Sequence, residues 1–580
     1  MKYFSNRDIA KLLRDIAAVY SVKGENNFKI IAYNNAADSV ENATRELKEL
    51  WEDKKLNSVS GLGKSIQSHL DELFKTGHVK HFDEVKKGFP PVMFDLINLA
   101  GMGPKNAYKL STTLKIKSIG ELETAAKEGK IRAIPTFGQK SEKEILASIL
   151  EFQGKNDRYN LPFTASVAQR VIDHIKKLGE AKEVEPLGSL RRMVSTIGDV
   201  DIAVASNEPA KIINHFKSFR ETARVVTSGD VSSSMILQNG MRIDLKIQPP
   251  EAFGALLQHF TGSKYHNIAL REYALKNKMS LSEYGIKYKG KLHKFANEAD
   301  FYHFLNLDYI EPELRENTGE IEAAKNHTLP ELIDTQNING DLHIHSNYPI
   351  EPSHDLGKNS FEQLIERALE LNYQYVGLSD HSPGASTHTK KQIIELIKKR
   401  TKKIEQINTS FKNIRVYNLL EIDILTSGEL SVPQEGLEML DFAIAGIHSS
   451  HNQPKDQITK RLMAAIDNPK VKIISHPTGR IIGERNSYEA DWETVFKKCV
   501  KTKTYLEINS WATRLDLPDT LVRLAKSLGV KFVINSDAHA VSHMDNIKFG
   551  VSVARRGWCT KDDVLNTCSY IEFSRHFGLS

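Results

Sequence analysis

The chain has 580 residues, of which 40% are hydrophobic and 26% charged, and its formal net charge at pH 7 is +6. This length exceeds what one hydrophobic core supports, so several globular domains are expected. No apolar run reaches membrane-spanning length, and the three cysteines form no CxxC pair, which argues against a membrane anchor, a disulfide framework and a cysteine zinc site. We expect a cytoplasmic monomer without a membrane partner, whose small positive charge permits a nucleic-acid partner.

Helical patterns open the chain. Residues 6–17, 28–39 and 65–76 place apolar side chains at helical spacing. Turns of small residues that end in lysine precede several helices: Gly61, Gly63 and Lys64; Gly101, Gly103 and Lys105; and, in a looser copy, Gly138 and Lys140. Glycine lets a phosphate approach the free N–H groups at a helix start. One such turn is usually a plain helix connection, but the repeat predicts helix-hairpin-helix elements that bind the DNA backbone without reading bases.

Two aspartates lie within residues 198–204, an apolar run typical of a β-strand. Because alternate side chains of a strand share a face, Asp199 and Asp201 point the same way, and a cation is needed to offset their mutual repulsion. Asp244 lies in a second alternating strand, residues 241–246, which as an antiparallel neighbour would bring it beside the pair. Carboxylate oxygens suit Mg²⁺. The three aspartates predict a magnesium centre, against the alternative of a solvated strand edge.

Groups that suit a phosphate precede these aspartates. Gly188 and Ser189 offer backbone and hydroxyl donors, and Arg191 or Arg192 offers a charged clamp. Together with residues 260–263 and 267–271, these motifs resemble the family X DNA polymerases, whose best known member is DNA polymerase beta. The resemblance extends over residues 1 to about 315.

The resemblance implies a DNA-directed DNA polymerase that fills short gaps during repair, with gapped or primed DNA and dNTPs as partners. It implies that Asp199, Asp201 and Asp244 are catalytic and hold two Mg²⁺ ions. The nucleotide-binding residues that it implies are Gly188, Ser189, Arg192, Gly198, His259, Phe260, Gly262, Asn267 and Arg271. His259 replaces the tyrosine of the beta enzyme, which leaves sugar discrimination open. His69 stands where relatives with lyase activity carry a Schiff-base lysine, so that activity is not predicted.

From residue 340 onward, short apolar strands alternate with amphipathic helices. Strands are predicted over residues 341–345, 375–379, 416–424, 442–448, 471–475, 505–509 and 531–535. Repeated βα units imply parallel strands, and we expect them to close into a barrel. Side chains that can bind metals lie in or just beyond these strands, where βα barrels build active sites: His343, His345, His381, Glu421, His448, His476, Asp537 and His539. Their convergence predicts a site for two or three Mn²⁺ or Zn²⁺ ions.

The motifs at residues 341–345, 379–381, 475–477 and 536–539 resemble the PHP (polymerase and histidinol phosphatase) domains of bacterial polymerases. The resemblance implies a distorted (β/α)7 TIM-like barrel with Mn²⁺-favouring 3′–5′ exonuclease activity. The family adds one more ligand in the loop after the first histidine pair. Here that loop is long, and His354 is the predicted ligand, with Glu351 and Asp355 as rivals.

Together these patterns predict a multidomain α+β and α/β protein. The expected domains are an N-terminal helical domain (1–88), fingers (89–156), a nucleotidyltransferase palm (157–250), a thumb (251–317), a linker (318–338) and a PHP domain (339–580). One alternative is a non-catalytic scaffold for DNA ends, and another is a nucleotidyltransferase fused to a small-molecule phosphatase. The intact ligand sets argue against the first alternative, and the helix-hairpin-helix turns argue against the second.

Overall fold

The computed structural model describes residues 4, 6–41, 47–52, 54, 56–59, 62–97, 99, 102–156 and 158–579. The chain forms two compact units, residues 1–157 and 158–580. Within the described ranges, no helix has the length and apolar character needed to cross a membrane. The three cysteines are free.

Helices make up the regular structure of the first unit. They are α1 (Asn6–Lys23), α2 (Asn27–Glu41), α3 (Leu47–Glu52), η1 (Leu56–Ser58), α4 (Lys64–Thr76), α5 (Lys80–Lys86), α6 (Pro91–Leu96), α7 (Pro104–Thr113), α8 (Ile119–Lys127) and α9 (Gln139–Asn156). One hydrophobic cluster gathers around Leu13, Leu70 and Phe82, and a second one around Leu96 and Leu110. The helices predicted from apolar spacing are therefore confirmed as α1, α2 and α4.

Two of the predicted glycine turns open helices. Gly63 and Gly103 are the N-caps of α4 and α7, both in extended backbone conformation. A Cβ built on either glycine meets no atom within 4 Å, so the surroundings of both caps are open. Lys64 and Lys105 lie in the first turns of these helices, whereas Gly61 and Gly101 lie outside the described residues.

The second unit begins with the palm, a mixed sheet with helices. Its elements are β1 (Tyr159–Asn160), α10 (Leu161–Lys176), β2 (Glu183–Pro186), α11 (Gly188–Arg191), β3 (Thr196–Ile197), β4 (Val200–Ala205), α12 (Pro209–Lys217), β5 (Thr222–Ser228), β6 (Ser232–Leu237) and β7 (Arg242–Gln248). The strand order is β2-β4-β7-β6-β5. Strands β4 and β7 pair in parallel, with Asp201 opposite Asp244.

The antiparallel pairing expected from the sequence is therefore wrong. The chain leaves β4 through α12 and the hairpin β5–β6, so β7 returns in the same direction as β4, and β6 becomes its antiparallel neighbour. The two faces of β4 are also distinct. Ile202 and Val204 join the cluster of α10 and α12, whereas Ala203 and Ala205 pack with Phe253 of the next domain. Alternation along the strand puts Asp201 on this second face.

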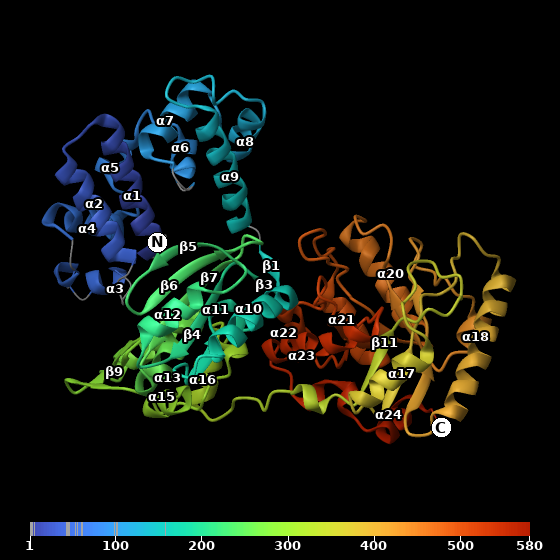
Figure 1. The fold of residues 1–580 in the computed structure, drawn as a ribbon. Coiled ribbons are helices and arrows are strands. Elements are labelled where there is room, and N and C mark those ends of the chain that lie inside the picture. Colours follow the sequence, from blue (N-terminus) through green and yellow to red (C-terminus); the bar gives the residue numbers. More distant parts are fainter. Residues whose placement is uncertain are drawn as a thin grey trace. The chain divides into compact units, whose positions relative to one another are not determined.

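The thumb follows directly. Its elements are η2 (Pro250–Ala252), α13 (Phe253–Thr261), α14 (Lys264–Lys276), β8 (Ser280–Ser282), β9 (Gly285–Tyr288), β10 (Lys291–His293), α15 (Glu298–Phe304) and η3 (Pro312–Leu314). The segment after it contains α16 (Glu320–Lys325) and η4 (Thr335–Asn337). Helix α16 begins the polar segment expected to be a linker, yet Ala324 packs with Phe301 and Tyr302 of the thumb. Buried Glu320 also lies 2.7 Å from His266 Nδ1. The chain then runs as a long extended segment toward the C-terminal part (Figure 1).

The C-terminal part alternates strands and helices. They are β11 (Gly340–Ile344), α17 (Phe361–Glu370), β12 (Tyr375–Leu378), α18 (Lys390–Ser410), β13 (Arg415–Asn418), β14 (Glu421–Asp423), α19 (Gln434–Leu437), β15 (Ala443–Gly446), α20 (Lys455–Asp467), β16 (Val471–Ile474), α21 (Trp492–Thr502), β17 (Tyr505–Asn509), α22 (Asp519–Ser527), β18 (Phe532–Asn535), η5 (Val541–Asn546), α23 (Ile547–Arg556), η6 (Lys561–Asp563), η7 (Leu565–Thr567) and α24 (Tyr570–Phe577). Every predicted strand is present, with residues 416–424 divided into β13 and β14.

These strands form two parallel sheets, β11-β12-β13 and β14-β15-β16-β17-β18. Isolated parallel bridges, His381 to Glu421 and Ile344 to Ala538, join residues next to the two sheets. The parallel α/β architecture is confirmed, and complete closure of the barrel stays a prediction.

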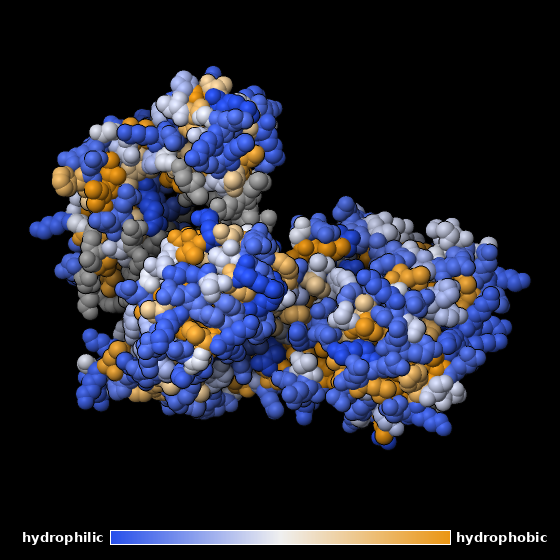
Figure 2. Space-filling view, viewed as in Figure 1, coloured by the Kyte–Doolittle hydropathy of each residue, from blue (hydrophilic) through white to orange (hydrophobic). Residues whose placement is uncertain are grey.

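Helix α18 illustrates how the helices cover this domain. Ile393, Ile397 and Ile404 are buried against the sheet side, whereas Lys398 and Lys402 are exposed. Figure 2 shows mainly hydrophilic side chains over the edge of the molecule where α18 lies in Figure 1. The amphipathic pattern thus fixes which face of the helix packs on the strands.

Candidate active sites

Three carboxylates gather at the palm sheet. Asp201 and Asp244 are register partners on neighbouring strands, and exposed Asp199 directly precedes β4. Arg242 Nε lies 2.9 Å from Asp244 Oδ2, and Ser234 Oγ donates to Asp244 Oδ1. The predicted trio is therefore brought together, although by a parallel pair of strands.

The electrostatics of the trio require a countercharge. Burial, and then the charges of Asp199 and Asp244, raise the pKa of Asp201 to about 7. A carboxylate in this position favours its protonated form until a cation offsets the repulsion. Three hard oxygen donors on one sheet face fit Mg²⁺, and these aspartates would hold it.

Glycines beside the three aspartates allow neighbouring groups to approach the backbone more closely than a side chain would permit. Gly188 has a φ of +57°, and a Cβ built on it would lie 3.3 Å from Asp201 Oδ2. Gly262 has a φ of +69°, and its Cβ would lie 3.1 Å from Arg192 Nη1. Gly198 is less restricted, since its nearest neighbour would be Arg158 Nη1 at 3.6 Å. At both Gly188 and Gly262, a larger residue is disfavoured by the positive φ and by the lack of space for a side chain.

The two arginines after Ser189 have separate partners. Arg191 reaches Thr261 Oγ1 at 2.7 Å and Glu298 Oε2 at 2.5 Å. Arg192 donates to Thr261 O at 2.5 Å and to Glu316 Oε1 at 3.0 Å. Both therefore tie the palm to the thumb, and Arg192 is the one that lies against the Gly262 turn.

The predicted thumb residues lie along the α13–α14 hairpin. Asn267 donates to His259 O at 2.7 Å and accepts from Gln258 Nε2 at 2.9 Å, so its side chain holds the two helices together. Burial, and then the charges of Arg271 and Lys246, lower the pKa of His259 to about 3. His259 is therefore neutral at physiological pH.

Phe260 adds an aromatic surface beside His259. Lys246 Nζ lies 4.4 Å from the ring centroid of Phe260, within the range of a cation–π contact. The ring of His259 meets that of Phe260 edge-on, with the centroids 4.7 Å apart. This cation–aromatic group lies on the same side of the palm as Asp201.

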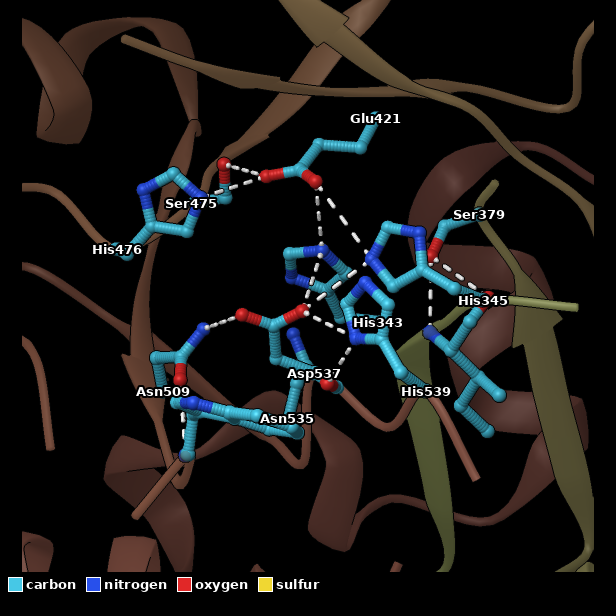
Figure 3. A network of polar contacts seen from close by, with 12 residues as sticks. His343, His345, Ser379, Glu421, Ser475, His476, Asn509, Asn535, Asp537 and His539 are labelled. Atoms are coloured by element: carbon cyan, nitrogen blue, oxygen red, sulfur yellow. Dashed lines mark hydrogen bonds and ion pairs between the residues drawn. The ribbon is translucent and has the colours of Figure 1, made fainter. Parts of the chain in front are cut away.

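A second cluster forms in the C-terminal domain, where imidazoles surround two carboxylates (Figure 3). Glu421 is the centre of the larger group, with His343 Nε2 at 3.1 Å, His448 Nε2 at 3.2 Å and His476 Nε2 at 2.7 Å. Asp537 lies 3.2 Å from His345 Nε2. All eight strand-associated residues predicted from the sequence meet here: His343, His345, His381, Glu421, His448, His476, Asp537 and His539.

The loop after the first histidine pair contributes two of its three candidates. His354 Nε2 lies 3.3 Å from Asp423 Oδ1. Asp355 has one carboxylate oxygen 3.6 Å from His381 Nε2 and the other 3.3 Å from His539 Nε2. Glu351 instead pairs with His388 at 2.8 Å, away from the cluster. The predicted His354 and its rival Asp355 both reach the site, at different edges.

Sequence reasoning missed groups that orient the ligands. Glu507 in β17 is fully buried, accepts from His476 N at 2.7 Å and lies 2.7 Å from His343 Nδ1. Asp423 lies 2.7 Å from His448 Nδ1. An acidic residue inside the apolar strand Tyr505–Asn509 was the available signal, because such a residue needs a buried partner.

The donor set fits bound cations. Several buried ring nitrogens make no hydrogen bond, among them His343 Nε2, His345 Nδ1 and Nε2, His381 Nδ1, His476 Nδ1 and His539 Nε2. Four groups of three side chains bring their ligand atoms within 4.8 Å of one another: His345, His381 and His539; His343, His345 and Asp537; His354, Asp423 and His448; and His381, Glu421 and His448. Imidazole mixed with carboxylate suits Mn²⁺ or Zn²⁺, and these residues would hold the ions.

Charge coupling within the cluster is strong. Despite burial, the Glu421 charge raises the pKa of His448 to about 9. Burial, and then His539 and His381, lower the pKa of His345 to about 3. Neighbouring imidazoles thus differ in basicity according to the balance of burial, carboxylates and other histidines around each, and the neutral ones are ready to bind metal.

A cavity of about 270 Å³ opens beside the cluster. Besides the ligands, it is lined by Trp511, Arg485 and Arg514. Arg514 Nη1 is buried without a hydrogen-bond partner, and Arg514 Nε lies 3.6 Å from Asp537 Oδ2. The mouth therefore combines an aromatic plane with cationic groups, which suits an anionic substrate.

A palm with a carboxylate trio, a thumb and a histidine-rich α/β domain define a nucleotidyltransferase joined to a metal-dependent phosphoesterase. Residues 256–316 match the DNA polymerase beta thumb family, and residues 4–79 match the helix-hairpin-helix domain family. The chain is 34% identical to the DNA polymerase/3′-5′ exonuclease PolX of Bacillus subtilis, over 97% of both chains. It therefore belongs to the PolX family of family X DNA polymerases.

Two further relatives each match one part of the chain. A probable phosphatase of a Thermoanaerobacter strain is 28% identical over 222 residues, which are 36% of this chain and 85% of that protein. DNA polymerase lambda of Rattus norvegicus is 23% identical over 343 residues, 54% of this chain and 56% of that protein. One of these relatives is named as a phosphatase and the other as a polymerase, which supports a chain composed of two different parts.

Replacing Asp201 by Asn tests the charge cluster of the palm. Because the pKa of Asp201 is raised from 3.8 to about 7, the unfolded chain ionises first as the pH rises, and wild-type stability falls between about pH 4 and pH 7 without a divalent cation. Asn cannot ionise, so Asp201→Asn should be more stable at pH 8 in EDTA by on the order of 1 kcal/mol, or about 2–4 °C in melting temperature. The difference should shrink toward pH 4.5.

Thermal unfolding followed by fluorescence measures this difference, and exposed Asp230→Asn in the same domain is the control. Mg²⁺ should stabilise the wild type more than Asp201→Asn. A variant that is less stable than the wild type at pH 8 in EDTA contradicts the interpretation.

Glu507→Gln tests the orienting role of a residue outside the metal-binding set. The amide keeps the shape but loses the charge that fixes His343, so Mn²⁺ or Zn²⁺ affinity should fall by about 10–100-fold. Isothermal titration of the chelated protein measures this affinity, and exposed Glu493→Gln is the matched control. Equal affinity in Glu507→Gln and the wild type would refute the role.

Proposed function

We propose that the palm catalyses DNA-directed nucleotidyl transfer that fills short gaps in DNA, and that the C-terminal domain is a metal-dependent 3′–5′ exonuclease. The observation that supports this most directly is the presence of two separate ligand sets in one chain, Asp201 opposite Asp244 and the cluster around Glu421. The PolX of B. subtilis carries both activities in its name. Trimming a 3′ end and refilling a gap together constitute repair.

In the polymerase site, Asp199, Asp201 and Asp244 would hold Mg²⁺ beside the primer 3′-hydroxyl. Bound Mg²⁺ would lower the pKa of that hydroxyl and stabilise the leaving pyrophosphate. Ser189 and Arg192 would bind the phosphates of the dNTP, and Gly188 would admit them close to Asp201. Gly198 and Gly262 are proposed to leave space for the nucleotide. His259, Phe260, Asn267 and Arg271 are proposed to contact its sugar and base.

Duplex DNA would be held by the first unit. Gly63 and Gly103 cap helices whose free N–H groups suit backbone phosphates, and Lys64 and Lys105 add charge. Gly61 and Gly101 are proposed to belong to the same turns. We assign residues 1–88 and 89–156 to DNA binding, 157–250 to the palm, 251–317 to the thumb, 318–338 to a linker and 339–580 to the PHP domain.

In the exonuclease site, the imidazoles and carboxylates would hold two or three ions, with Mn²⁺ the favoured one. Bound ions would acidify a water and neutralise the charge of the phosphodiester. Arg485 and Arg514 would bind the scissile phosphate from the open side of the cavity, and Trp511 would stack on the terminal base.

Two variants separate the activities. Asp201→Ala removes the central palm carboxylate, so primer extension in Mg²⁺ on gapped DNA should fall by about a thousandfold or more. His343→Ala should abolish 3′ degradation in Mn²⁺ and leave extension in place. Extension that is unchanged in Asp201→Ala would refute the polymerase site. If either variant lost both activities, the proposal that the two centres act independently would be refuted.

A small-molecule phosphatase activity is the second candidate for the C-terminal site, favoured by the similarity to a probable phosphatase. The cavity lining argues for DNA instead, since an aromatic plane and two arginines suit a nucleotide. Degradation of 3′-recessed DNA should therefore exceed hydrolysis of p-nitrophenyl phosphate and sugar phosphates. Phosphate release from the small esters without DNA degradation would favour the phosphatase.

Arg514→Ala tests substrate binding at the exonuclease site. Loss of the guanidinium, whose Nη1 has no hydrogen-bond partner, should lower exonuclease kcat/KM by about 10–100-fold, mainly through KM, while the bound Mn²⁺ content stays unchanged. Lys455→Ala, at an exposed position of the same domain, is the control. An unchanged KM would exclude Arg514 from phosphate binding.

A further inference from the structure

An arginine of the C-terminal domain reaches the polymerase site. Arg556 is the last residue of α23, and its side chain is only 7% exposed. Its Nη1 donates to Arg192 O at 2.8 Å and to Glu316 Oε1 at 3.0 Å, and its Nε donates to Asp519 Oδ2 at 2.7 Å. One guanidinium thus joins the C-terminal domain, the thumb and the palm.

Glu316 is shared between two arginines. The same oxygen, Oε1, lies 3.0 Å from Arg192 Nε and 3.0 Å from Arg556 Nη1. Arg192 Nη1 donates to Thr261 O at 2.5 Å, directly before the Gly262 turn. Arg192 is therefore pulled toward the thumb by a carboxylate that also has a second cationic partner.

This sharing matters for phosphate binding. A triphosphate that draws the Arg192 guanidinium away would leave Glu316, whose side chain is 28% exposed, without its first partner. A half-buried carboxylate without a countercharge is costly, and it would compete with the phosphates for Arg192. Arg556 removes both problems, because it retains Glu316 and fixes the Arg192 carbonyl at the end of α11.

We propose that Arg556 is a positioning residue of the polymerase site, which holds Glu316 and the Arg192 backbone so that the Arg192 guanidinium is available to the phosphates of the incoming nucleotide. The proposal rests on the proposed polymerase function. On this proposal, the C-terminal domain, to which we assign the exonuclease activity, also completes the nucleotide-binding site of the polymerase.

The neighbouring residue supplies a matched control. Arg555 Nε donates to Glu313 Oε1 at 2.7 Å, and Arg555 Nη1 donates to Ile333 O at 3.0 Å. Arg555 thus joins the C-terminal domain to the thumb and to the segment before β11, with contacts that lie away from Arg192 and Glu316. A general loosening of the domain contact would affect both variants, whereas the proposed role belongs to Arg556 alone.

The test is single-nucleotide insertion on gapped DNA in Mg²⁺ by the full chain, with dNTP binding measured in parallel by titration. Arg556→Ala should raise the KM and the dissociation constant for dNTP by about tenfold, with a smaller change in kcat. DNA affinity and exonuclease activity should match the wild type, which verifies folding. Arg556→Lys should restore part of the loss, and Arg555→Ala should leave KM for dNTP unchanged.

Glu316→Gln in the Arg556→Ala background should return KM toward the wild-type value, because a neutral amide competes weakly for Arg192. An unchanged KM in Arg556→Ala, an equal rise in Arg555→Ala, or no restoration by Glu316→Gln would overturn the proposal. A wild-type protein that neither extends primers nor binds dNTP would instead overturn the proposed polymerase function, and this inference with it.

Discussion

Charge compensation in poorly hydrated surroundings is the constraint on which both sites depend. Asp201 faces two other carboxylates at the palm, and Glu421 faces a ring of imidazoles. Separating such groups from water costs more than their mutual contacts return unless opposite charge is close by. The C-terminal cluster supplies part of that charge itself through protonated histidines such as His448, whereas at the palm Lys246 and Arg242 offset the raised pKa of Asp201 in part. The donor atoms differ as well: carboxylate oxygens alone suit Mg²⁺ at the palm, whereas imidazole nitrogens mixed with carboxylates suit transition metals in the C-terminal cluster.

The same constraint governs the contact between palm, thumb and C-terminal domain. Arginines carry it, each with a buried or half-buried partner. Arg191 of the palm pairs with buried Glu298 of the thumb, and Arg480 of the C-terminal domain lies 3.3 Å from Ser195 Oγ of the palm. Arg556 extends this pattern to the nucleotide site. Guanidinium groups serve this purpose because several fixed donors can satisfy several acceptors at once.

The palm and the C-terminal domain are joined by direct side-chain contacts as well as by the chain between them. A polymerase and an exonuclease that are joined by a flexible linker would act independently, and the extended chain before β11 alone would permit this. Residues 158–580 instead form one compact unit, in which the arginine contacts and a hydrophobic cluster shared by the palm and the C-terminal domain join the two parts. Through Arg556, the end of α23 contacts the backbone directly after α11.

Much of this molecule follows from local sequence. Period-two and period-3.6 patterns predicted the strands and helices, and the conjunction of histidines with strand ends predicted the cluster around Glu421, because side-chain direction is a local property of the backbone. Strand alternation predicted the aspartate trio, and family motifs predicted the thumb. These predictions depend on residues close together in the chain.

Tertiary structure alone decided the rest. The parallel pairing of β4 with β7, the position of Glu507 behind His343, and the sharing of Glu316 by two arginines each join residues far apart in the sequence. The loop with His354 likewise needed the fold to show which of its polar side chains reach the cluster. The sequence determines which groups can carry charge, but only the packed chain decides which of them become neighbours, because Coulombic and hydrogen-bond energies depend on distances of a few ångströms.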